Sequence, residues 1–311
     1  MRSAIIGSNG FIGKAIARAL QADGHQTIGI DRHPADPGSN IVDTHVACDI
    51  RDREGLFAAL QGVDEVYHVA AFLGTSELED DLRGAIDTNV LGSLNVFEAA
   101  LRNGARKVFF ASKPSVWLNT YTITKHSAEQ IARHFARYHP LEIVIMRYLN
   151  IYGPGQKLYP VRKILPVFAA QALRNRPIQV FGDGQQTVDM LFVRDAARIT
   201  VDVMRAETAP DPLDCGTGVA MRVLDVATAV NEYFGNSAGV ALIPMRKGET
   251  PGTHLVADMR ALRRLLPDVS FTPWAGGLAE SLAWYAALPS HHIDAALAFH
   301  GLGTRYSQAW N

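Results

Sequence analysis

The sequence predicts an α/β fold, with a doubly wound parallel sheet followed by a smaller C-terminal α/β lobe. In the first half of the chain, short apolar runs that end in Gly or polar turns alternate with helix-length segments. Buried strands that alternate with helices are typical of parallel pairing, because each helix carries the chain back to the start of the next strand. After NIYGPGQ, residues 150–156, Pro and Gly interrupt the sequence more often, which indicates a smaller lobe laid over the sheet.

The expected strands and helices follow in order along the first half. Strands are predicted at residues 4–7, 27–31, 65–71, 107–112 and 142–148, and a further strand precedes CDIRD at 48–52. Helices are predicted at 10–24, 53–62, 86–104 and 121–139, and three of them end in a glycine at the C-terminal cap position. The large domain is expected at 1–155 with a return at about 188–216, the lobe at 156–187 and 217–290, and a tail at 291–311.

Bulk composition excludes several classes of protein. Lys plus Arg (30) nearly equals Asp plus Glu (31), so no basic face for nucleic acid is expected. Cys48 and Cys215 lie far apart, which suits a reducing compartment and predicts no metal site. The pair His291–His292 and His300 match no metal-ligand spacing and are expected to be solvated tail residues. No signal peptide or membrane-spanning run is visible, so a cytoplasmic location without membrane contact is expected.

The sequence GSNGFIG places Gly7, Gly10 and Gly13 after the first strand and at the start of a helix. Without side chains, these positions let a pyrophosphate approach backbone N–H groups and the positive end of the helix dipole. Asp31 ends the next strand, where a carboxylate can bond ribose hydroxyls and would repel a 2′-phosphate. We therefore predict a Rossmann-type site for NAD rather than NADP, although Arg32 beside Asp31 leaves NADP open. The predicted cofactor-binding residues here are Gly7, Gly10, Phe11, Ile12, Gly13, Asp31 and Arg32.

Two further segments are candidates for the adenine and nicotinamide ends of the same site. Asp49 could bond the adenine amino group with Ile50 against the ring, or Asp49 could simply cap the helix that follows. The small residues Ala70 and Ala71 end a strand where a flat cofactor must pass. His68, in the same strand, is more often a packed histidine than a ligand.

Tyr121 and Lys125 lie four residues apart on a helix that opens at Thr120 or Tyr121, so their side chains share one face. A nearby ammonium and an oxidised nicotinamide both favour the phenolate, and Tyr121 could then take a proton from a substrate hydroxyl. The alternative is an exposed tyrosine beside a Lys125–Glu129 ion pair. Ser112 ends the preceding strand and is the candidate donor that polarises a transient ketone.

These motifs together resemble the extended short-chain dehydrogenase/reductase family, particularly its nucleotide-sugar epimerases and dehydratases. The resemblance rests on GSNGFIG, Asp31 and YTITK, and extends through DTNVLGSLNVFEAA, RYLNIYGPGQ, VFGDGQQTVDMLFVRD, CGTG and ADMRALRRLLPDVSFTPWAGGLAESLAWY, up to about Tyr285. Several motifs in the family order are more specific than any one of them. The resemblance implies NAD held by the Rossmann domain and a nucleoside-diphosphate sugar, UDP-linked, held by the lobe.

The resemblance also implies roles for particular residues and a mode of assembly. Asn89 would belong to the active-site helix and contact the cofactor, and Asn150 would lie on the substrate side. Phe181 would pack the nucleotide, or be a plain core aromatic, and Arg246 would contact the diphosphate. A homodimer through the helices around Leu91–Leu101 and Tyr121–Tyr138 is expected.

The chain departs from the family pattern at two places that bear on the site. The loop before Tyr121 is shortened, and Lys113 stands where the hydroxyl of the catalytic triad is expected, between Ser112 and Pro114. An ammonium there would suit a carboxylate and so a uronic-acid substrate. Val188 replaces an arginine that commonly binds the diphosphate, and Arg246, Arg162–Lys163 or Lys113 could compensate, although Arg162 and Lys163 could also be solvated.

The sequence therefore predicts an NAD-dependent epimerase of a nucleoside-diphosphate sugar, which works through a transient keto intermediate. Tyr121 would be the base, Lys125 would tune it, and Ser112 would polarise the ketone. One alternative is a short-chain reductase or dehydrogenase that acts on a non-nucleotide hydroxy compound. Another is an NAD-binding protein with an impaired catalytic site, which the shortened loop and Val188 would favour.

Overall fold

The computed structural model describes residues 1–35, 38 and 40–302 and confirms the doubly wound sheet. Seven parallel strands follow the order β11-β6-β5-β4-β1-β2-β3. Their bounds are β1 Arg2–Ile6, β2 Gln26–Asp31, β3 Thr44–Ala47, β4 Glu65–His68, β5 Lys107–Ser112, β6 Glu142–Tyr148 and β11 Leu213–Cys215. From β1 the sheet grows in one direction through β2 and β3, and from β4 it grows in the other direction. The switch between β1 and β4 creates a crevice at the carboxyl ends of these strands, where such sheets bind ligands.

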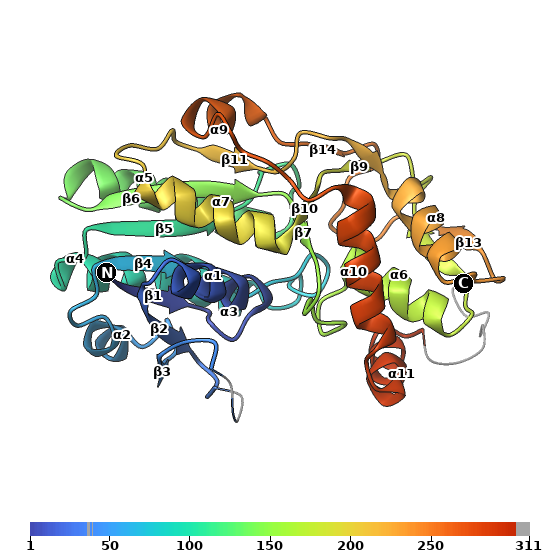
Figure 1. Cartoon of the computed structure of the whole chain (residues 1–311), viewed down its shortest axis with the longest axis horizontal. Coiled ribbons are helices and arrows are strands. Elements are labelled where there is room, and N and C mark those ends of the chain that lie inside the picture. The colour runs from blue at the N-terminus through green and yellow to red at the C-terminus, as the bar shows by residue number, and fades with distance from the viewer. Residues whose placement is uncertain (36–37, 39, 303–311) are drawn as a thin grey trace.

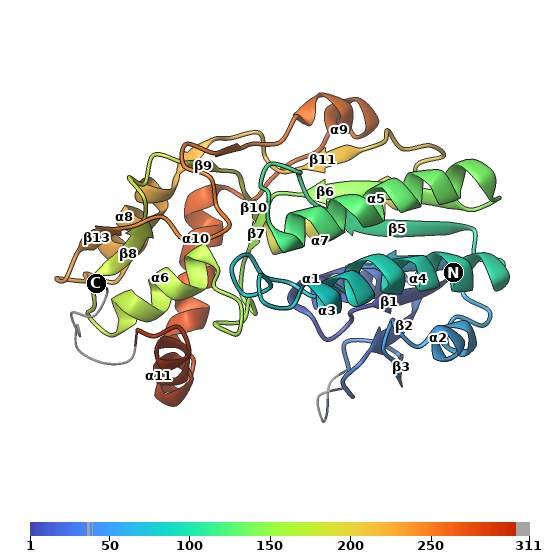
Figure 2. The same cartoon turned by 180° about the vertical axis from the view of Figure 1, so that it is seen from behind.

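Helices cover both faces of this sheet. One face packs α1 (Phe11–Ala22), α7 (Val193–Arg205) and α9 (Met259–Leu265) over a core that includes Ile5, Phe109 and Met146 (Figure 1). The other face packs α2 (Arg53–Ala59), α4 (Gly92–Arg102) and α5 (Thr120–Tyr138), as the reverse view shows (Figure 2). Between β4 and α4 the chain forms α3 (Leu82–Ile86) and a π-helical turn, η1 (Asp87–Leu91).

The smaller lobe has its own hydrophobic core. It contains α6 (Ile164–Leu173), α8 (Val223–Tyr233), α10 (Trp274–Ala286) and α11 (Ser290–Phe299). Strand β8 (Ile178–Phe181) pairs in parallel with β13 (Val240–Ile243), and β9 (Thr187–Val188) lies between β12 (Met221–Arg222) and β14 (His254–Leu255). The short pair β7 (Asn150–Tyr152) and β10 (Met190–Phe192) lies where the chain passes between the two parts (Figure 1).

The C-terminal region differs from the expected tail. Residues 290–299 form α11, whose apolar side chains Ile293, Ala296 and Leu297 are buried in the core of the lobe. His300 packs here as well, with its ring Nε2 2.9 Å from the carbonyl oxygen of Leu158. The periodic apolar positions 293, 296 and 297 are the signal of an amphipathic helix in this segment. Residues 303–311 lie outside the described part of the chain.

Local sequence explains where the two helices nearest the site begin. The Asn119 side chain accepts a hydrogen bond of 2.8 Å from the backbone N–H of Thr122 and so caps α5. Asp52, not Asp49, caps α2 by accepting from the N–H of Gly55. Capping therefore accounts for Asp52 and leaves the Asp49 carboxylate to another role.

Candidate active site

A cavity of about 630 Å³ lies at the carboxyl ends of the sheet strands and extends to the smaller lobe. Its walls contain almost every residue that the sequence singled out. The predicted residues that line it are Gly7, Gly10, Phe11, Ile12, Gly13, Asp31, Arg32, Asp49, Ile50, Ala70, Ala71, Ser112, Lys113, Tyr121, Lys125, Asn150, Arg162, Lys163, Phe181 and Arg246. Tertiary folding therefore brings segments that are up to 239 positions apart, Gly7 to Arg246, to one cavity.

The glycine turn between β1 and α1 is packed too closely for any side chain. Gly7 has a φ of +93°, and its N–H donates to the carbonyl of Ile30 at 2.8 Å. A Cβ at Gly13 would lie 2.1 Å from the Gly7 carbonyl oxygen, and a Cβ at Gly7 would lie 2.9 Å from the Ala70 nitrogen. The start of α1 is thus bare backbone that faces the cavity, which fits a pyrophosphate bound to N–H groups.

Asp31 ends β2 at the rim of this turn, and its carboxylate is held in place from two sides. One oxygen accepts from the backbone N–H of Asn9 and the other from that of His33, both at 3.1 Å. Arg32 also lines the cavity, but its Nε contacts the ring of His33 at 3.1 Å. The fixed carboxylate fits ribose hydroxyls better than it fits a 2′-phosphate.

The segment after β3, where the sequence predicts the adenine, lines one part of the cavity. Asp49 forms a 2.7 Å ion pair with Arg51, and hydrogen bonds from Arg51 lower the pKa of the Asp49 carboxyl despite its partial burial. Ile50 is buried against Gly92, where a Cβ would come within 2.7 Å of its side chain. Asp49 is therefore an ionised acceptor already paired with an arginine.

Two polar residues near the nicotinamide side are buried behind the cavity wall. His68 is fully packed, with Nε2 3.0 Å from the Ser93 hydroxyl, and burial followed by the charge of Lys125 lowers its pKa to about 3. Asn89 accepts from the N–H of Phe72 at 2.7 Å and donates to its carbonyl at 3.0 Å. Asn89 also donates to Thr124, so it fixes the loop after β4 to α5 rather than lining the cavity itself.

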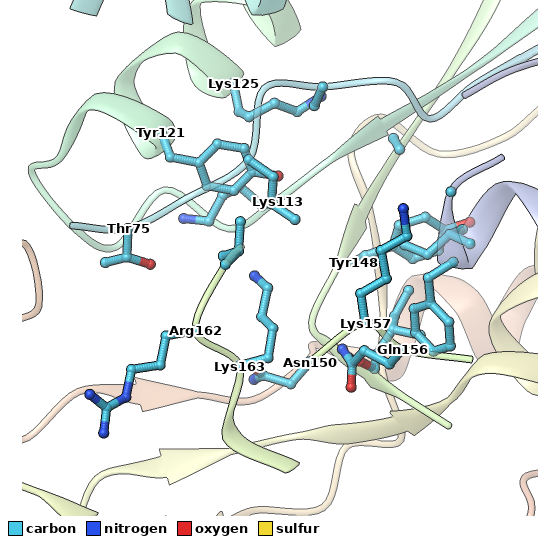
Figure 3. Close-up of a pocket in the computed structure, with 18 of the residues that line it drawn as sticks. Thr75, Lys113, Tyr121, Lys125, Tyr148, Asn150, Gln156, Lys157, Arg162 and Lys163 are labelled. Carbon is cyan, nitrogen blue, oxygen red and sulfur yellow. The ribbon is translucent and has the colours of Figure 1, made fainter. Parts of the chain in front are cut away.

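Tyr121 and Lys125 both line the cavity from the first turns of α5 (Figure 3). Lys125 is only 3% exposed, and its ammonium lies 4.3 Å from the centre of the Phe110 ring. Burial lowers the pKa of Lys125 to about 7, with the charge of Lys113 acting in the same direction and that of Glu129 opposing it. Burial also raises the pKa of Tyr121 above its ordinary value.

Glu129 does not form the ion pair with Lys125 that the alternative interpretation of this helix expected. Its buried carboxylate accepts from Ser112 Oγ at 2.6 Å and forms ion pairs with Arg147 at 2.5 Å and Arg133 at 2.7 Å. The carboxylate is completely inaccessible to solvent. The four-residue spacing of Lys125 and Glu129 predicts a contact between them on α5. The observed partners of Glu129 instead lie on β5, on β6 and on the following turn of α5.

Ser112 lies at the end of β5 with 4% exposure, and its hydroxyl hydrogen is directed at Glu129. In this arrangement the oxygen can accept a hydrogen bond from a ligand, but its hydrogen is already engaged. The next residue, Lys113, donates to the Pro114 carbonyl at 2.9 Å and to Thr122 Oγ1 at 2.7 Å. Its ammonium lies 5.8 Å from the centre of the Tyr121 ring.

The lobe side of the cavity is formed around Phe181, which is only partly buried and therefore no plain core aromatic. The guanidinium carbons of Arg162 and Arg246 lie 4.6 Å and 5.6 Å from its ring centre. Arg246 pairs with Glu249, and its buried Nε has no protein partner within the described residues. Val188 is buried at 5% exposure and adds no charge to this wall.

Sequence reasoning missed several residues in and around the cavity. Gln156 and Lys157 line it, beside Asn150 (Figure 3). Glu77 lies behind the wall, where it accepts from the backbone N–H groups of Thr75 at 2.8 Å and Arg162 at 2.9 Å and so ties the loop after β4 to the lobe. No short motif marks these positions, because they become neighbours only when the lobe folds over the sheet.

Comparison with known proteins agrees with this geometry. The sequence model of the NAD dependent epimerase/dehydratase family matches residues 4–216, and the chain belongs to this family. A UDP-N-acetyl-alpha-D-glucosaminuronate decarboxylase of Bacillus cytotoxicus is 27% identical over 91% of this chain and 97% of its own length. A UDP-glucose 4-epimerase of Mycolicibacterium smegmatis is 25% identical over 92% and 98%.

Solved structures show the same relationship. The fold is that of the Thermotoga maritima UDP-glucose 4-epimerase with UDP-glucose, with a TM-score of 0.82 and 24% identity over 92% of this chain and 98% of that one. MoeE5, solved with UDP-glucose and NAD, has a TM-score of 0.82 and 26% identity over 91% and 98%. NAD is the cofactor of the family, and the glycine turn and Asp31 fit it.

The described part of the chain contains neither a candidate metal site nor a candidate membrane-spanning helix. Residues 1–35, 38 and 40–302 contain no cluster of three His, Cys, Asp or Glu side chains that could hold a metal ion. Over the same ranges, no helix is both long enough and apolar enough to cross a membrane.

Proposed function

We propose that this protein is an NAD-dependent epimerase of a nucleoside-diphosphate sugar. The observation that carries the proposal is the position of Tyr121 and Lys125. Both line the one cavity that has the glycine turn and Asp31 at one end and Phe181 with Arg246 at the other. A sugar that lies beside Tyr121 can therefore reach the cofactor on one side while its nucleotide binds the lobe. The names of the relatives support uridine as the base.

Tyr121 is the proposed base. Its phenolate takes the proton of a sugar hydroxyl and later returns it, and NAD when bound accepts the hydride from the same carbon and gives it back. Return to the opposite face of the keto sugar inverts the carbon, so no net oxidation results. Burial disfavours the phenolate, and a protonated Lys125 one helical turn away would favour it. Burial lowers the pKa of Lys125 to about 7.

The diphosphate is proposed to bind beside Phe181. Arg246 and Arg162 flank this ring, and the unpartnered Nε of Arg246 is a donor that a phosphate oxygen can satisfy. The uracil ring can stack on Phe181, which is only partly covered by protein. These residues supply the positive charge that Val188 does not.

A second candidate reaction is decarboxylation of a uronic-acid sugar. Lys113 at the position of the expected hydroxyl favours it, as does the decarboxylase among the relatives. Both reactions would begin with oxidation of the sugar alcohol, with Tyr121 as the base and bound NAD as the hydride acceptor, so the two differ only in the fate of the keto sugar. A reductase or an impaired NAD-binding protein remains the alternative in which Tyr121 does not start this cycle.

The test is turnover of UDP-sugars by the NAD-loaded protein and by Tyr121→Phe. Products are followed by NMR and mass spectrometry, and NADH by its absorbance. An epimerase gives an isomer of unchanged mass without net NADH, a decarboxylase gives loss of CO2, and a reductase consumes or releases NADH stoichiometrically. Tyr121→Phe should abolish turnover and leave NAD binding intact, whereas the exposed Tyr233→Phe should be fully active. Full activity in Tyr121→Phe would show that this tyrosine is not the base.

The nucleotide assignment has its own test in Arg246→Ala. Loss of a charged hydrogen bond should weaken UDP binding by about 1.5–3 kcal/mol and leave NAD binding unchanged. The exposed neighbour Lys247→Ala removes one positive charge outside the cavity and serves as the matched control. Equal UDP affinities for both variants and the parent would contradict the diphosphate assignment.

We also propose a homodimer through η1–α4 and α5. Leu91 and Ile123 on these helices are 49% and 45% exposed and offer apolar surface that a partner chain could cover. Light scattering coupled to gel filtration measures the mass directly. A monomer at micromolar concentration would contradict this assembly.

A further inference from the structure

Two lysines that line the cavity, Lys113 and Lys163, form no ion pair with any side chain in the described part of the chain. Lys113 bonds only neutral acceptors, the Pro114 carbonyl and Thr122 Oγ1, and an ammonium has a third proton to donate. Lys163 is the residue before the first turn of α6, and its side chain makes no hydrogen bond or ion pair with any residue between 1 and 35 or between 40 and 302. Both are among the residues that line the cavity.

The two ammonium groups act on the same space. Figure 3 shows the side chain of Lys163 extended from the lobe toward Tyr121 and Lys113, whereas Arg162 points the other way. The charge of Lys163 is one of the causes, after burial, that lower the pKa of Lys113 to about 8. Burial and the charge of Arg246 lower the pKa of Lys163 to about 8 as well, against the opposing charges of Glu77 and Glu249. Burial and neighbouring positive charge therefore outweigh the surrounding carboxylates at Lys163.

The carboxylates on this side of the cavity are already occupied. Glu77 accepts from the backbone N–H groups of Thr75 and Arg162, and Glu249 pairs with Arg246. Glu129 lies behind the wall, fully buried against Arg147 and Ser112. Glu77 and Glu249 act on Lys163 from a distance, but neither forms an ion pair with it or with Lys113. A bound ligand can therefore supply the direct anionic partner that the two ammonium groups lack.

The diphosphate does not meet this need at Lys113, because the proposed diphosphate site lies around Phe181 with Arg162 and Arg246. Lys113 lies instead beside Tyr121, directly after Ser112 and 5.8 Å from the centre of the Tyr121 ring. Lys163 follows Arg162 and feels the charge of Arg246, but its side chain extends toward Tyr121 and Lys113 (Figure 3). A neutral sugar in this place would leave two partly buried ammonium groups facing hydroxyls alone. Charges that are withdrawn from water without a partner are costly, and a bidentate carboxylate can accept from both lysines at once.

We propose that the substrate sugar carries a carboxylate, which Lys113 and Lys163 hold between them beside Tyr121. The substrate class is then a nucleoside-diphosphate uronate. This inference rests on the proposed function, because it places a nucleotide sugar in the cavity. The two lysines act as specificity-determining residues, and the first turn of α6 behind Lys163 adds partial positive charge at the same place.

The experiment compares binding of UDP-glucuronate, UDP-glucose and UDP to the NAD-loaded protein by calorimetry. The parent should bind UDP-glucuronate at least 10-fold more tightly than UDP-glucose. Lys113→Met and Lys163→Met should each reduce this ratio by about 10- to 150-fold or abolish it, the range for one charged hydrogen bond. Lys247→Met, an equal charge change outside the cavity, should leave the ratio unchanged. Lys113→Arg should restore part of the preference, and NAD binding reports that each variant is folded.

The outcomes separate this inference from the proposed function. Equal affinities for the two sugars, or a preference that survives in both Met variants, would overturn the carboxylate site while UDP binding and Tyr121-dependent turnover could still stand. A lysine-dependent preference in a protein whose turnover survives Tyr121→Phe would retain the carboxylate site and reject the epimerase mechanism. Failure to bind UDP and both sugars would overturn the two proposals together.

Discussion

Removal of the Glu129 carboxylate tests whether the buried charge network behind Ser112 supports the fold of the site. Glu129→Ala deletes a fully inaccessible carboxylate that accepts from Ser112 at 2.6 Å and pairs with Arg147 at 2.5 Å and Arg133 at 2.7 Å. Arg133 keeps a second partner, Asp211, at 3.0 Å. Arg147, with a side chain only 23% exposed, loses its one carboxylate partner among the described residues.

The expected loss follows from that difference. Breaking a buried ion pair so that one charge stays behind costs about 3–5 kcal/mol of unfolding free energy. Glu129→Gln keeps the shape and one acceptor for Ser112 but leaves Arg147 against a neutral amide, so about 1–3 kcal/mol is expected. The control is Glu280→Ala, because the Arg194–Glu280 pair is 61% and 43% exposed and should contribute only about 0–1 kcal/mol.

The assay is denaturant unfolding without NAD, with two spectroscopic probes to check that the transition is two-state. A loss of unfolding free energy for Glu129→Ala no larger than that for Glu280→Ala would refute the reasoning.

The pH dependence of the unfolding free energy provides a second measurement. Burial raises the pKa of the Glu129 carboxyl, but hydrogen bonds from Arg147 and Ser112 and the arginine charges outweigh it and lower the pKa below 4.5. The stabilisation is therefore complete above about pH 4.5 and is lost as pH falls through the lowered value.

Three further predictions concern the ligands. Asp31 should give at least tenfold tighter binding of NAD than of NADP, about 1.4 kcal/mol by calorimetry, and equal affinities would contradict it. Gly13→Ala should abolish NAD-induced thermal stabilisation, because its Cβ would lie 2.1 Å from the Gly7 oxygen, whereas Gly276→Ala in open space should not. The preference for UDP-glucuronate over UDP-glucose should fall as pH rises through about 8, where the facing ammonium groups of Lys113 and Lys163 lose their protons, with Tyr121 beside them still neutral. A preference that is constant up to pH of about 9.5 would contradict this last expectation.

The order of strands and helices and the cofactor turn followed from the sequence because they depend on local patterns. Apolar runs of strand length, the spacing of Gly7, Gly10 and Gly13, and Asp31 at a strand end are all short-range signals. The pairing of Tyr121 with Lys125 on one face of α5 is likewise a matter of helical periodicity. Residues 290–299 show the limit, because their helix gains its stability mainly from contacts with α6 and the rest of the lobe.

Only the tertiary structure decided which charges face one another. In the sequence, Glu129 is four residues from Lys125, yet its carboxylate binds Ser112, Arg147 and Arg133. Lys113 and Lys163 are 50 positions apart and carry no shared motif, yet folding of the lobe over the sheet brings both to the cavity near Tyr121. The physical reason is the sequence separation over which each kind of interaction acts. Backbone geometry and helix spacing act over a few residues, whereas ion pairing and desolvation depend on distances that exist only after the chain has folded.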